Sequence, residues 1–369
     1  MSIETPSSTP RARDPLIGQT IAGRFVVEEL IGQGGMGKVY RAQHLGQGRP
    51  VVLKLLKPAL LEDPTLVGRF EREAEAASRL DHPNLIAVLD FGRTGPEGTL
   101  YIAMELVPGK DLRALLRDEW PVQEPRLCNI VAQVLSALSA AHARNVIHRD
   151  LKPENIMVEA RAGGRDFVKV LDFGIARILD SDLPRLTRKD VVCGTPQYMA
   201  PEQATGGGLD ARSDLYAVGV ILYQMCTGHL PFDGQNSMEV LTRQVNEPPI
   251  PPRLRQPGAP ISEAMERMIL RALEKDPARR PQTAEQFRRE LLAVVQPEAA
   301  APPAAVTCPA PVPAAGMPTT LPRAEGRWRA RVVAGIAVGV LAAAVVAGAK
   351  VARVHLRAPV PPAPGVGRR

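Results

Sequence analysis

His148-Arg149-Asp150-Leu151-Lys152-Pro153-Glu154-Asn155 is the stretch from which the rest of the chain can be understood. It brings a carboxylate, an ammonium group and a carboxamide together in one short loop. Asp172-Phe173-Gly174 follows seventeen residues after Asn155. A carboxylate base, two oxygen ligands of the kind that Mg²⁺ prefers and a lysine within reach of a phosphate fit phosphoryl transfer from a magnesium nucleotide better than other chemistry.

The polar residues of this loop have separate candidate roles. Asp150 is the candidate base that orients an attacking hydroxyl, and Lys152 is placed to offset the charge of the transferring phosphoryl group. Asn155 and Asp172 offer hard oxygen atoms to a magnesium ion. A polar surface loop without chemistry is the alternative, and the ordered coincidence of these residue types disfavours it.

The composition indicates a globular protein with an aliphatic core, since 45% of the 369 residues are hydrophobic and only 4% are aromatic. The net charge of +7 would suit nucleic acid or anionic lipid, but no run of five basic residues occurs, and we expect no nucleic-acid partner. The four cysteines lie far apart, which favours a reducing compartment over a zinc site or a disulfide framework. The N-terminal residues lack the apolar segment of a signal peptide.

The chain divides by composition into five expected parts. Residues 1–20 are polar and are expected to form a disordered tail. Residues 21–295 alternate apolar segments with turns and form the expected globular domain. Residues 296–331 are rich in Pro and Ala and predict a semi-stiff linker. Residues 332–349 carry no charge, and residues 350–369 form a short basic tail.

Within the globular part the pattern changes from strands to helices near residue 109. Strands are expected at 25–31, 39–42, 51–56, 84–91 and 99–106, with one charged helix at 65–80. Longer helices are expected at 123–143, 213–226, 237–246, 262–273 and 283–295. This predicts an α+β protein of two lobes, a small β-rich lobe (about 21–107) and a large helical lobe (about 108–295), with a cleft near 105–110.

A glycine-rich segment joins the first two expected strands. It reads Ile31-Gly32-Gln33-Gly34-Gly35-Met36-Gly37-Lys38-Val39. Glycines let the backbone approach phosphates closely and present N–H groups to them. Because a strand follows, a strand–loop–strand hairpin is favoured over a dinucleotide fingerprint, which requires a helix there. An ordinary flexible hairpin is the alternative.

Lys54 ends the apolar run at 51–54 and needs an anionic partner, because an unpaired buried ammonium is costly. The partner can be a phosphate, a carboxylate or both. The charged helix offers Glu71, Glu73 and Glu75, and spacing alone does not choose among them. A lysine that reaches solvent from an edge strand is the alternative.

Together these motifs resemble the eukaryotic-type (Hanks-type) protein kinase family, and in detail its bacterial, PknB-like Ser/Thr members. The resemblance covers about 23–295. It rests on elements that occur in the family's order: the loop 32–39, Lys54, Glu73, the loop 148–155, Asp172-Phe173-Gly174, the segment Gly194-Thr195-Pro196-Gln197-Tyr198-Met199-Ala200-Pro201-Glu202, Asp214 and Arg280. His82-Pro83-Asn84 and the Gly-Gly-Met-Gly of the phosphate loop are typical of the bacterial group.

The resemblance implies an ATP site formed by residues 31–39 and a hinge. It selects Glu73 over its neighbours as the partner of Lys54. It implies that the backbone of Glu105 and Val107 binds adenine, with Met104 behind them as gatekeeper. It implies bound Mg²⁺, with Mn²⁺ as a substitute.

The resemblance further implies that Glu202 pairs with Arg280 and that Asp214 supports the catalytic loop from a buried helix. The expected activity is transfer of the γ-phosphoryl group of ATP to Ser or Thr hydroxyls of proteins, including the kinase itself. A nucleotide-binding pseudokinase or scaffold at the membrane is the alternative, disfavoured because no catalytic position is degraded. A small-molecule phosphotransferase is disfavoured because 195–202 resembles a platform for protein substrates.

Arg149 precedes the candidate base and resembles the family's docking point for a phosphorylated activation loop, through a charge-assisted arginine–phosphate pair. That loop is expected at 172–202. Thr187 is our candidate phosphosite, and Thr195 resembles the threonine that positions substrates. Lys189 stands where PknB-like kinases carry a second threonine, which argues against double phosphorylation.

Residues 332–349 are eighteen uncharged residues, about 27 Å long as a helix, which just spans a bilayer. We expect a single-pass protein of the plasma (inner) membrane with a cytoplasmic kinase domain, because the kinase uses ATP. Gly335, Gly339, Ala343 and Ala347 recur every four residues, so a homodimer through this helix is a hypothesis, with the kinase lobe as a second contact. Ordinary Ala-rich composition is the alternative reading of that stripe.

Overall fold

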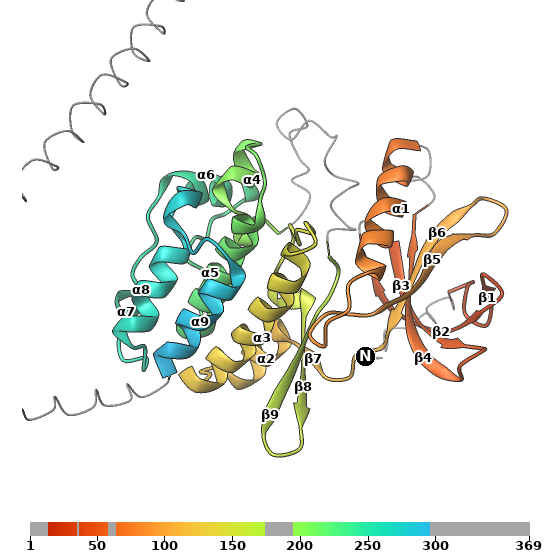
Figure 1. Ribbon diagram of the computed structural model, residues 1–369, viewed down its shortest axis with the longest axis horizontal. Helices are drawn as coiled ribbons and strands as arrows, with labels where there is room; N and C mark the ends of the chain where they lie inside the picture. The colour runs from red at the N-terminus through yellow and green to blue at the C-terminus, as the bar shows by residue number, and fades with distance from the viewer. Residues whose placement is uncertain (1–13, 35–36, 58–63, 174–194, 296–369) are drawn as a thin grey trace, which may run out of the picture. The chain divides into compact units, whose positions relative to one another are not determined.

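The computed structural model describes residues 14–34, 37–57, 64–173 and 195–295, without the side chains of residues 64–66, 69 and 73. All of them belong to one compact unit, Met1–Pro302, while a second unit, Pro303–Arg369, lies outside the described residues. The described chain has a β-rich lobe followed by a helical lobe (Figure 1). The two-lobed α+β fold expected from the sequence is therefore confirmed.

The β-rich lobe is built on one antiparallel sheet in the order β1-β2-β3-β4-β6-β5. Its hairpins connect neighbours in sequence, as short turns require. The strands are β1 (Thr20–Ile21), β2 (Phe25–Gln33), β3 (Gly37–His44), β4 (Arg49–Leu56), β5 (Val88–Thr94) and β6 (Thr99–Glu105).

The two faces of this sheet are buried differently. Leu53 and its neighbours two residues away point into an apolar cluster that includes Tyr40 and Phe25. The opposite face packs against α1 (Pro64–Ser78), where Phe70 contacts a cluster shared with Ile102. Because side chains alternate along a strand, Lys54 lies on a different face from Leu53.

The helical lobe surrounds a helix that is buried almost along its whole length. This helix, α5, is apolar on most sides, which is typical of a helix in the centre of a domain. It begins at the N-cap Asp210 and ends at Gly228, whose φ of 73° forms a left-handed cap. The helices are α2 (Leu112–Glu119), α3 (Glu124–His142), α4 (Pro201–Thr205), α5 (Ala211–Thr227), α6 (Ser237–Asn246), α7 (Pro252–Arg255), α8 (Glu263–Ala272) and α9 (Ala284–Val295).

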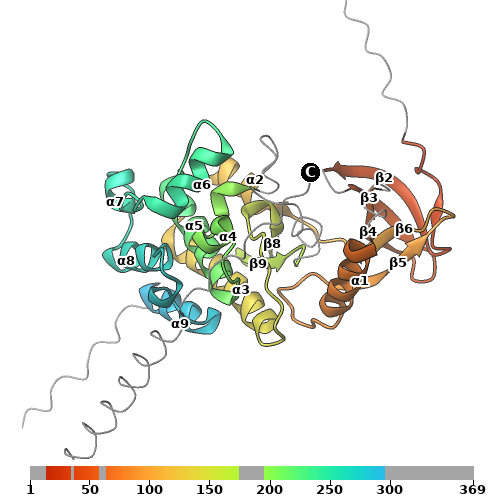
Figure 2. The ribbon, with the colours of Figure 1, turned by 90° about the horizontal axis from the view of Figure 1, so that it is seen from above.

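A second, three-stranded sheet was not expected from the sequence. It consists of β7 (Lys110–Asp111), β8 (Ile156–Arg161) and β9 (Arg165–Val170) and packs beside α3 (Figure 1 and Figure 2). The prediction of helices alone after residue 109 was wrong here. A short apolar run does not show whether its apolar residues repeat with the period of a helix or of a strand. One available signal was the turn between β8 and β9, where Gly163 and Gly164 both have positive φ.

The strand expected at 84–91 begins only at Val88. The residues before Val88 pair with the end of β9 instead: Ile86 N donates to Val170 O at 3.0 Å, and Val170 N donates to Asn84 O at 2.9 Å. These two bonds attach the segment before β5 to the sheet whose strand β8 directly follows the loop 148–155.

Residues 14–20, which were expected to belong to a disordered tail, are part of the folded lobe. Gly18 N donates to Val27 O at 2.8 Å, and Leu16 and Ile17 pack against the apolar cluster around Phe25. In the part of the chain that the structure describes, no helix combines the length and apolar character needed to cross a bilayer. The expected linker, membrane helix and basic tail (296–369) lie outside that part.

Candidate active site

The loop 148–155 lies between α3 and β8, and one buried carboxylate binds its backbone. Asp214 of α5, only 1% exposed, accepts hydrogen bonds from His148 N and Arg149 N, each at 2.9 Å. His142 Nε2 lies 2.7 Å from the same carboxylate. A buried carboxylate is stable only when donors surround it, so Asp214 and the loop backbone determine each other's positions.

Two residues of the site have left-handed backbone conformations. Arg149 has a φ of 65° and Asp172 a φ of 51°. Such conformations cost about 1 kcal/mol or more for a residue with a Cβ, and they persist where surrounding contacts enforce them. For Arg149 the contact is Asp214, and near Asp172 it is the bond from Leu171 N to Asn155 O at 2.8 Å.

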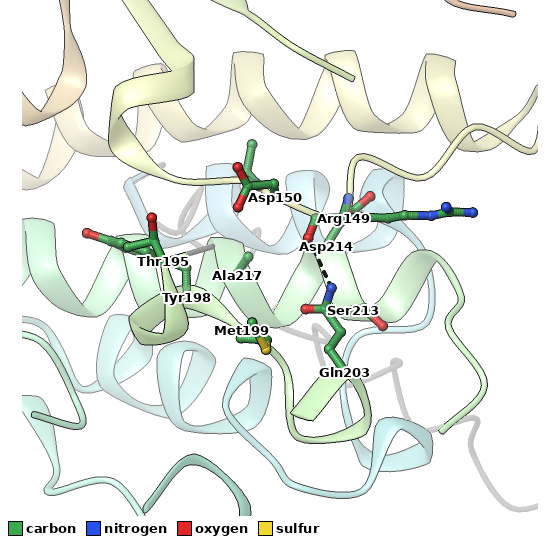
Figure 3. A pocket seen from close by; sticks show the side chains of 10 residues that line it. Arg149, Asp150, Thr195, Tyr198, Met199, Gln203, Ser213, Asp214 and Ala217 are labelled. Carbon is green, nitrogen blue, oxygen red and sulfur yellow. Dashed lines mark hydrogen bonds between the residues drawn. The ribbon is translucent and has the colours of Figure 1, made fainter. Parts of the chain in front are cut away.

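The candidate base, the lysine and the substrate-positioning threonine lie together. Lys152 Nζ is 2.9 Å from Asp150 Oδ2 and 3.4 Å from Thr195 Oγ1. Asp150 and Thr195 also line a small cavity of about 10 Å³, room for about one water molecule (Figure 3). The carboxylate of the candidate base thus lies beside the ammonium group of Lys152, at the start of the 195–202 segment.

Asn155 and Asp172 have the donor chemistry of a magnesium site. Asn155 Nδ2 donates to Asp150 O at 2.8 Å. The amide oxygen of Asn155 therefore points away from the Asp150 carbonyl. Burial acts to raise the pKa of Asp172, but the charge and hydrogen bond of Lys54 outweigh it and hold that pKa below its usual range. An ionised carboxylate and a carboxamide oxygen fit Mg²⁺, which takes its remaining ligands from water and phosphates.

Lys54 has an anionic partner, but from the other lobe. Its Nζ lies 2.9 Å from Asp172 Oδ2, and its side chain is only 14% exposed. The side chain of Glu73, the partner that the resemblance implied, lies outside the described residues. The structure therefore links two predicted site residues, Lys54 and Asp172, that were not predicted to contact each other.

The glycine-rich segment is a β2–β3 hairpin, as predicted. Gly34 N donates to Gly37 O at 2.9 Å, while Gly35 and Met36 lie outside the described residues. A Cβ on Gly37 would lie 2.0 Å from Leu55 O, so this glycine is required by the close approach of β3 to β4.

The other described residues of the segment differ in their surroundings. Ile31 is 48% exposed, as an apolar side chain at the edge of a binding cleft would be. Val39 pairs with Lys54 across β3 and β4 and so shares its face of the sheet. The ammonium group of Lys38 instead binds Asp14 at 2.6 Å. Gly32 and Gln33 end β2, opposite Val39 and Lys38.

The expected hinge follows β6. Met104 is buried, and with Asp172 and Phe173 it lines a small apolar cavity. The side chain of Glu105 accepts hydrogen bonds from Lys169 Nζ at 2.6 Å and Ala87 N at 2.8 Å, and its backbone N donates to Ala87 O at 3.1 Å. Val107 is partly buried against the cluster that contains Met104.

The segment 195–202 is attached to the helical lobe by a buried ion pair. Arg280 donates to both carboxylate oxygens of Glu202 at 2.8 Å, and its side chain is fully buried. Burial acts to raise the pKa of Glu202, but hydrogen bonds from Arg280 and Ser213 hold it below the usual range. Glu202 and Arg280 thus form the pair that the resemblance implied.

Two glutamines position the same segment and were missed by the sequence reasoning. Gln203 Nε2 donates to Arg149 O at 3.0 Å, which joins α4 to the catalytic loop (Figure 3). Gln244 of α6 is fully buried and donates to Gln197 O at 2.6 Å. No local pattern marks either residue, because a glutamine on an amphipathic helix usually faces solvent.

Thr187, the candidate phosphosite, lies outside the described residues, as do Gly174 and Gly194. Arg149, its expected docking point, extends away from Asp150 (Figure 3).

Comparison with known proteins gives consistent similarities. Residues 25–292 match the family described as the protein kinase domain. Serine/threonine-protein kinase pkn3 of Myxococcus xanthus is 60% identical over 283 residues, 76% of this chain and 52% of that protein. Serine/threonine-protein kinase PknB of Mycobacterium tuberculosis is 41% identical over 276 residues, 74% of this chain and 43% of that protein.

The crystal structure of the PknI kinase domain of Mycobacterium tuberculosis has a TM-score of 0.59 and 30% identity, and the match covers 74% of this chain and 97% of that domain. The chain spans about half the length of the two full-length relatives, 52% and 43%. The similarity therefore concerns their shared domain.

Proposed function

The chain belongs to the protein kinase family, and we propose that it is a bacterial-type Ser/Thr kinase that transfers the γ-phosphoryl group of ATP to hydroxyls of protein substrates. One observation carries this proposal: Lys152 Nζ lies within 3.4 Å of both Asp150 and Thr195. The proton acceptor, the charge that faces the phosphoryl group and the threonine at the substrate platform therefore meet at one point.

In the proposed reaction Asp150 orients the substrate hydroxyl and accepts its proton as the hydroxyl oxygen attacks the γ-phosphorus, while the bond from that phosphorus to the β–γ bridging oxygen breaks and ADP leaves. Lys152, 2.9 Å from Asp150, offsets the negative charge that builds up on the phosphoryl oxygens. Asn155 and Asp172 would hold Mg²⁺, which supplies charge neutralisation of the phosphates when bound.

The nucleotide would lie between the glycine-rich hairpin and the hinge. Lys54, which is paired with Asp172, would also bind the α- and β-phosphates. The backbone of Glu105 and Val107 would bind adenine, as the family resemblance implies; for Glu105 the carbonyl oxygen would make the contact, because its N–H donates to Ala87 O at 3.1 Å.

Further parts of the proposal rest on the sequence. Autophosphorylation at Thr187 would create a phosphate for Arg149. The uncharged stretch at 332–349 would anchor the protein in the plasma membrane with its kinase domain in the cytoplasm, and would support a homodimer. Single-cysteine labelling from outside intact cells tests this topology, since label on residues before 332 would contradict it.

The activity is tested by incubating the full chain with γ-³²P-ATP, Mg²⁺ and a generic protein substrate. We expect label on phosphoserine and phosphothreonine with the wild type and a loss of at least about a thousandfold with Asp150→Asn. Asp118→Asn, at an exposed carboxylate of α2, is the matched control and should transfer normally. Nucleotide binding without transfer by the wild type would instead favour a scaffold.

A further inference from the structure

A segment that precedes the family-matched domain is attached to the back of the glycine-rich hairpin. The family match begins at residue 25, whereas the described chain begins at Asp14. Asp14 Oδ2 lies 2.6 Å from Lys38 Nζ, and Asp14 Oδ1 accepts from Tyr40 Oη at 3.1 Å and from Leu16 N at 3.1 Å. With a side chain only 8% exposed, Asp14 has both oxygens engaged in a sheltered position.

The register of the sheet shows which side of the hairpin Asp14 contacts. Residues directly opposite each other on β3 and β4 share a face, so Val39 lies on the face of Lys54 and Lys38 on the face of Leu55. Tyr40 and Leu55 belong to the apolar cluster on the side away from Lys54. Asp14 therefore holds the hairpin from the face opposite the proposed phosphate site.

The segment around Asp14 is itself bound to the first strand of the hairpin. Gly18 N donates to Val27 O at 2.8 Å, and Val27 N donates to Gln19 O at 2.9 Å. Asp14 is thus anchored through its own segment to β2 and through its carboxylate to β3. The hydrogen bond from Lys38 holds the pKa of Asp14 below its usual range, so this carboxylate is ionised at neutral pH.

We propose that Asp14 is a positioning residue for the nucleotide: it fixes the base of the glycine-rich hairpin through Lys38, so that strands β2 and β3 lose less conformational freedom when a nucleotide binds. A preorganised loop binds more tightly because the ordering penalty is smaller. The proposal rests on the proposed use of ATP, and it adds a residue outside the family-matched domain to the determinants of ATP affinity.

The test compares Asp14→Asn and Lys38→Met in the full chain. The dissociation constant of a fluorescent ATP analogue and the KM for ATP should each rise about fivefold, the factor that corresponds to ~1 kcal/mol. The kcat and the KM for the protein substrate should stay within about twofold for Asp14→Asn, because this residue touches neither reactant. The double variant should bind no more weakly than either single one, since both changes break one interaction.

The matched control is Glu28→Gln, which breaks the exposed pair between Glu28 and Arg41 on the same two strands. It should leave nucleotide affinity unchanged, because an exposed ion pair contributes little to order. Lys38→Arg keeps the charge and should restore most of the affinity lost in Lys38→Met.

Unchanged nucleotide affinity in folded Asp14→Asn and Lys38→Met, or additive effects in the double variant, would overturn the inference. A lowered melting temperature with normal affinity would assign Asp14 a purely structural role and would also overturn it. If Asp14→Asn does not fold, the nucleotide affinities of Lys38→Met and Lys38→Arg still test the proposal. In both variants Asp14 keeps its hydrogen bonds from Tyr40 and Leu16. Absence of transfer by the wild type would contradict the proposed function instead.

Discussion

Replacing Arg280 gives the most demanding test of how residues 195–202, the proposed platform for protein substrates, are attached to the helical lobe. Arg280 donates to Glu202 through two nitrogens at 2.8 Å, and it also donates to the backbone oxygens of Glu274 at 2.7 Å, Lys275 at 3.0 Å and Arg212 at 3.2 Å. Arg280→Met keeps most of the apolar stem and removes every one of these bonds. It leaves the carboxylate of Glu202 buried without its ion-pair partner.

The expected loss follows from that geometry. Breaking a buried pair by removing one partner costs about 3–5 kcal/mol, since a buried charge is left uncompensated. A domain is stable by only about 5–15 kcal/mol, so Arg280→Met should unfold at a much lower urea concentration. Removing both charges in Glu202→Gln/Arg280→Met should recover part of the loss, because no charge is then buried alone. Arg280→Lys should recover little, because a single ammonium group cannot replace the planar fork.

The assay is urea unfolding followed by circular dichroism at neutral and acidic pH. The pKa of Glu202 is held below its ordinary 4.5 in the folded protein. The stability that this pair contributes is therefore fully present above pH 4.5 and is lost as pH falls through the lower, folded-state value. The difference in stability between wild type and Arg280→Met should narrow under acid, without vanishing, because the bonds from Arg280 to three backbone oxygens do not depend on the protonation of Glu202. A loss below about 1 kcal/mol at neutral pH, or no narrowing in acid, would refute the reasoning.

Three further predictions concern residues around the same site. Gln244→Leu removes the donor to Gln197 O and should raise the KM for a protein substrate about tenfold, while the KM for ATP stays within about twofold. Equal changes in the two KM values would contradict a role for Gln244 in positioning residues 195–202. Gly37→Ala places a Cβ 2.0 Å from Leu55 O and should lower both the melting temperature and the affinity for an ATP analogue, whereas Gly34→Ala, with open space around it, should leave the melting temperature unchanged. Burial and the nearby charge of Arg280 lower the pKa of Lys275 to about 8 from its ordinary 10.5. The wild type should therefore gain stability relative to Lys275→Met as pH rises from 8 towards 10.5. If the urea midpoints of the two proteins instead change in parallel over that range, the pKa of Lys275 is not lowered.

The catalytic loop could be predicted because its residues are neighbours in the chain. Asp150, Lys152 and Asn155 lie within six residues, so any compact loop brings their polar groups close together. The bond of 2.9 Å between Lys152 and Asp150 and that of 2.8 Å between Asn155 and the Asp150 carbonyl follow from this local geometry. The helices α1, α3, α5, α6, α8 and α9, each of ten residues or more, were also predicted, whereas the shorter α2, α4 and α7 were not, because an apolar pattern needs several turns to be recognised.

The second sheet was missed because short strands carry too little periodicity to be told from other apolar runs. The ordering of residues 14–20 was missed for a different reason. Asp14 is a polar residue in a polar segment, and its ionised side chain gains a partner only where β3 presents Lys38 and Tyr40 side by side on one face.

By itself the sequence indicated the chemistry that we propose for this protein, since the residue types and their order along the chain predict a candidate base, a lysine for the phosphoryl group and two candidate oxygen ligands. Only the tertiary structure decided which groups from distant parts of the chain contact each other. Lys54 meets Asp172 across 118 positions, and Gln244 meets the Gln197 carbonyl across 47. Chain connectivity restricts distances within a loop to a few ångströms, whereas between distant segments many oppositely charged or hydrogen-bonding groups satisfy the same pairing rule. Strand register and helix packing then select one of them.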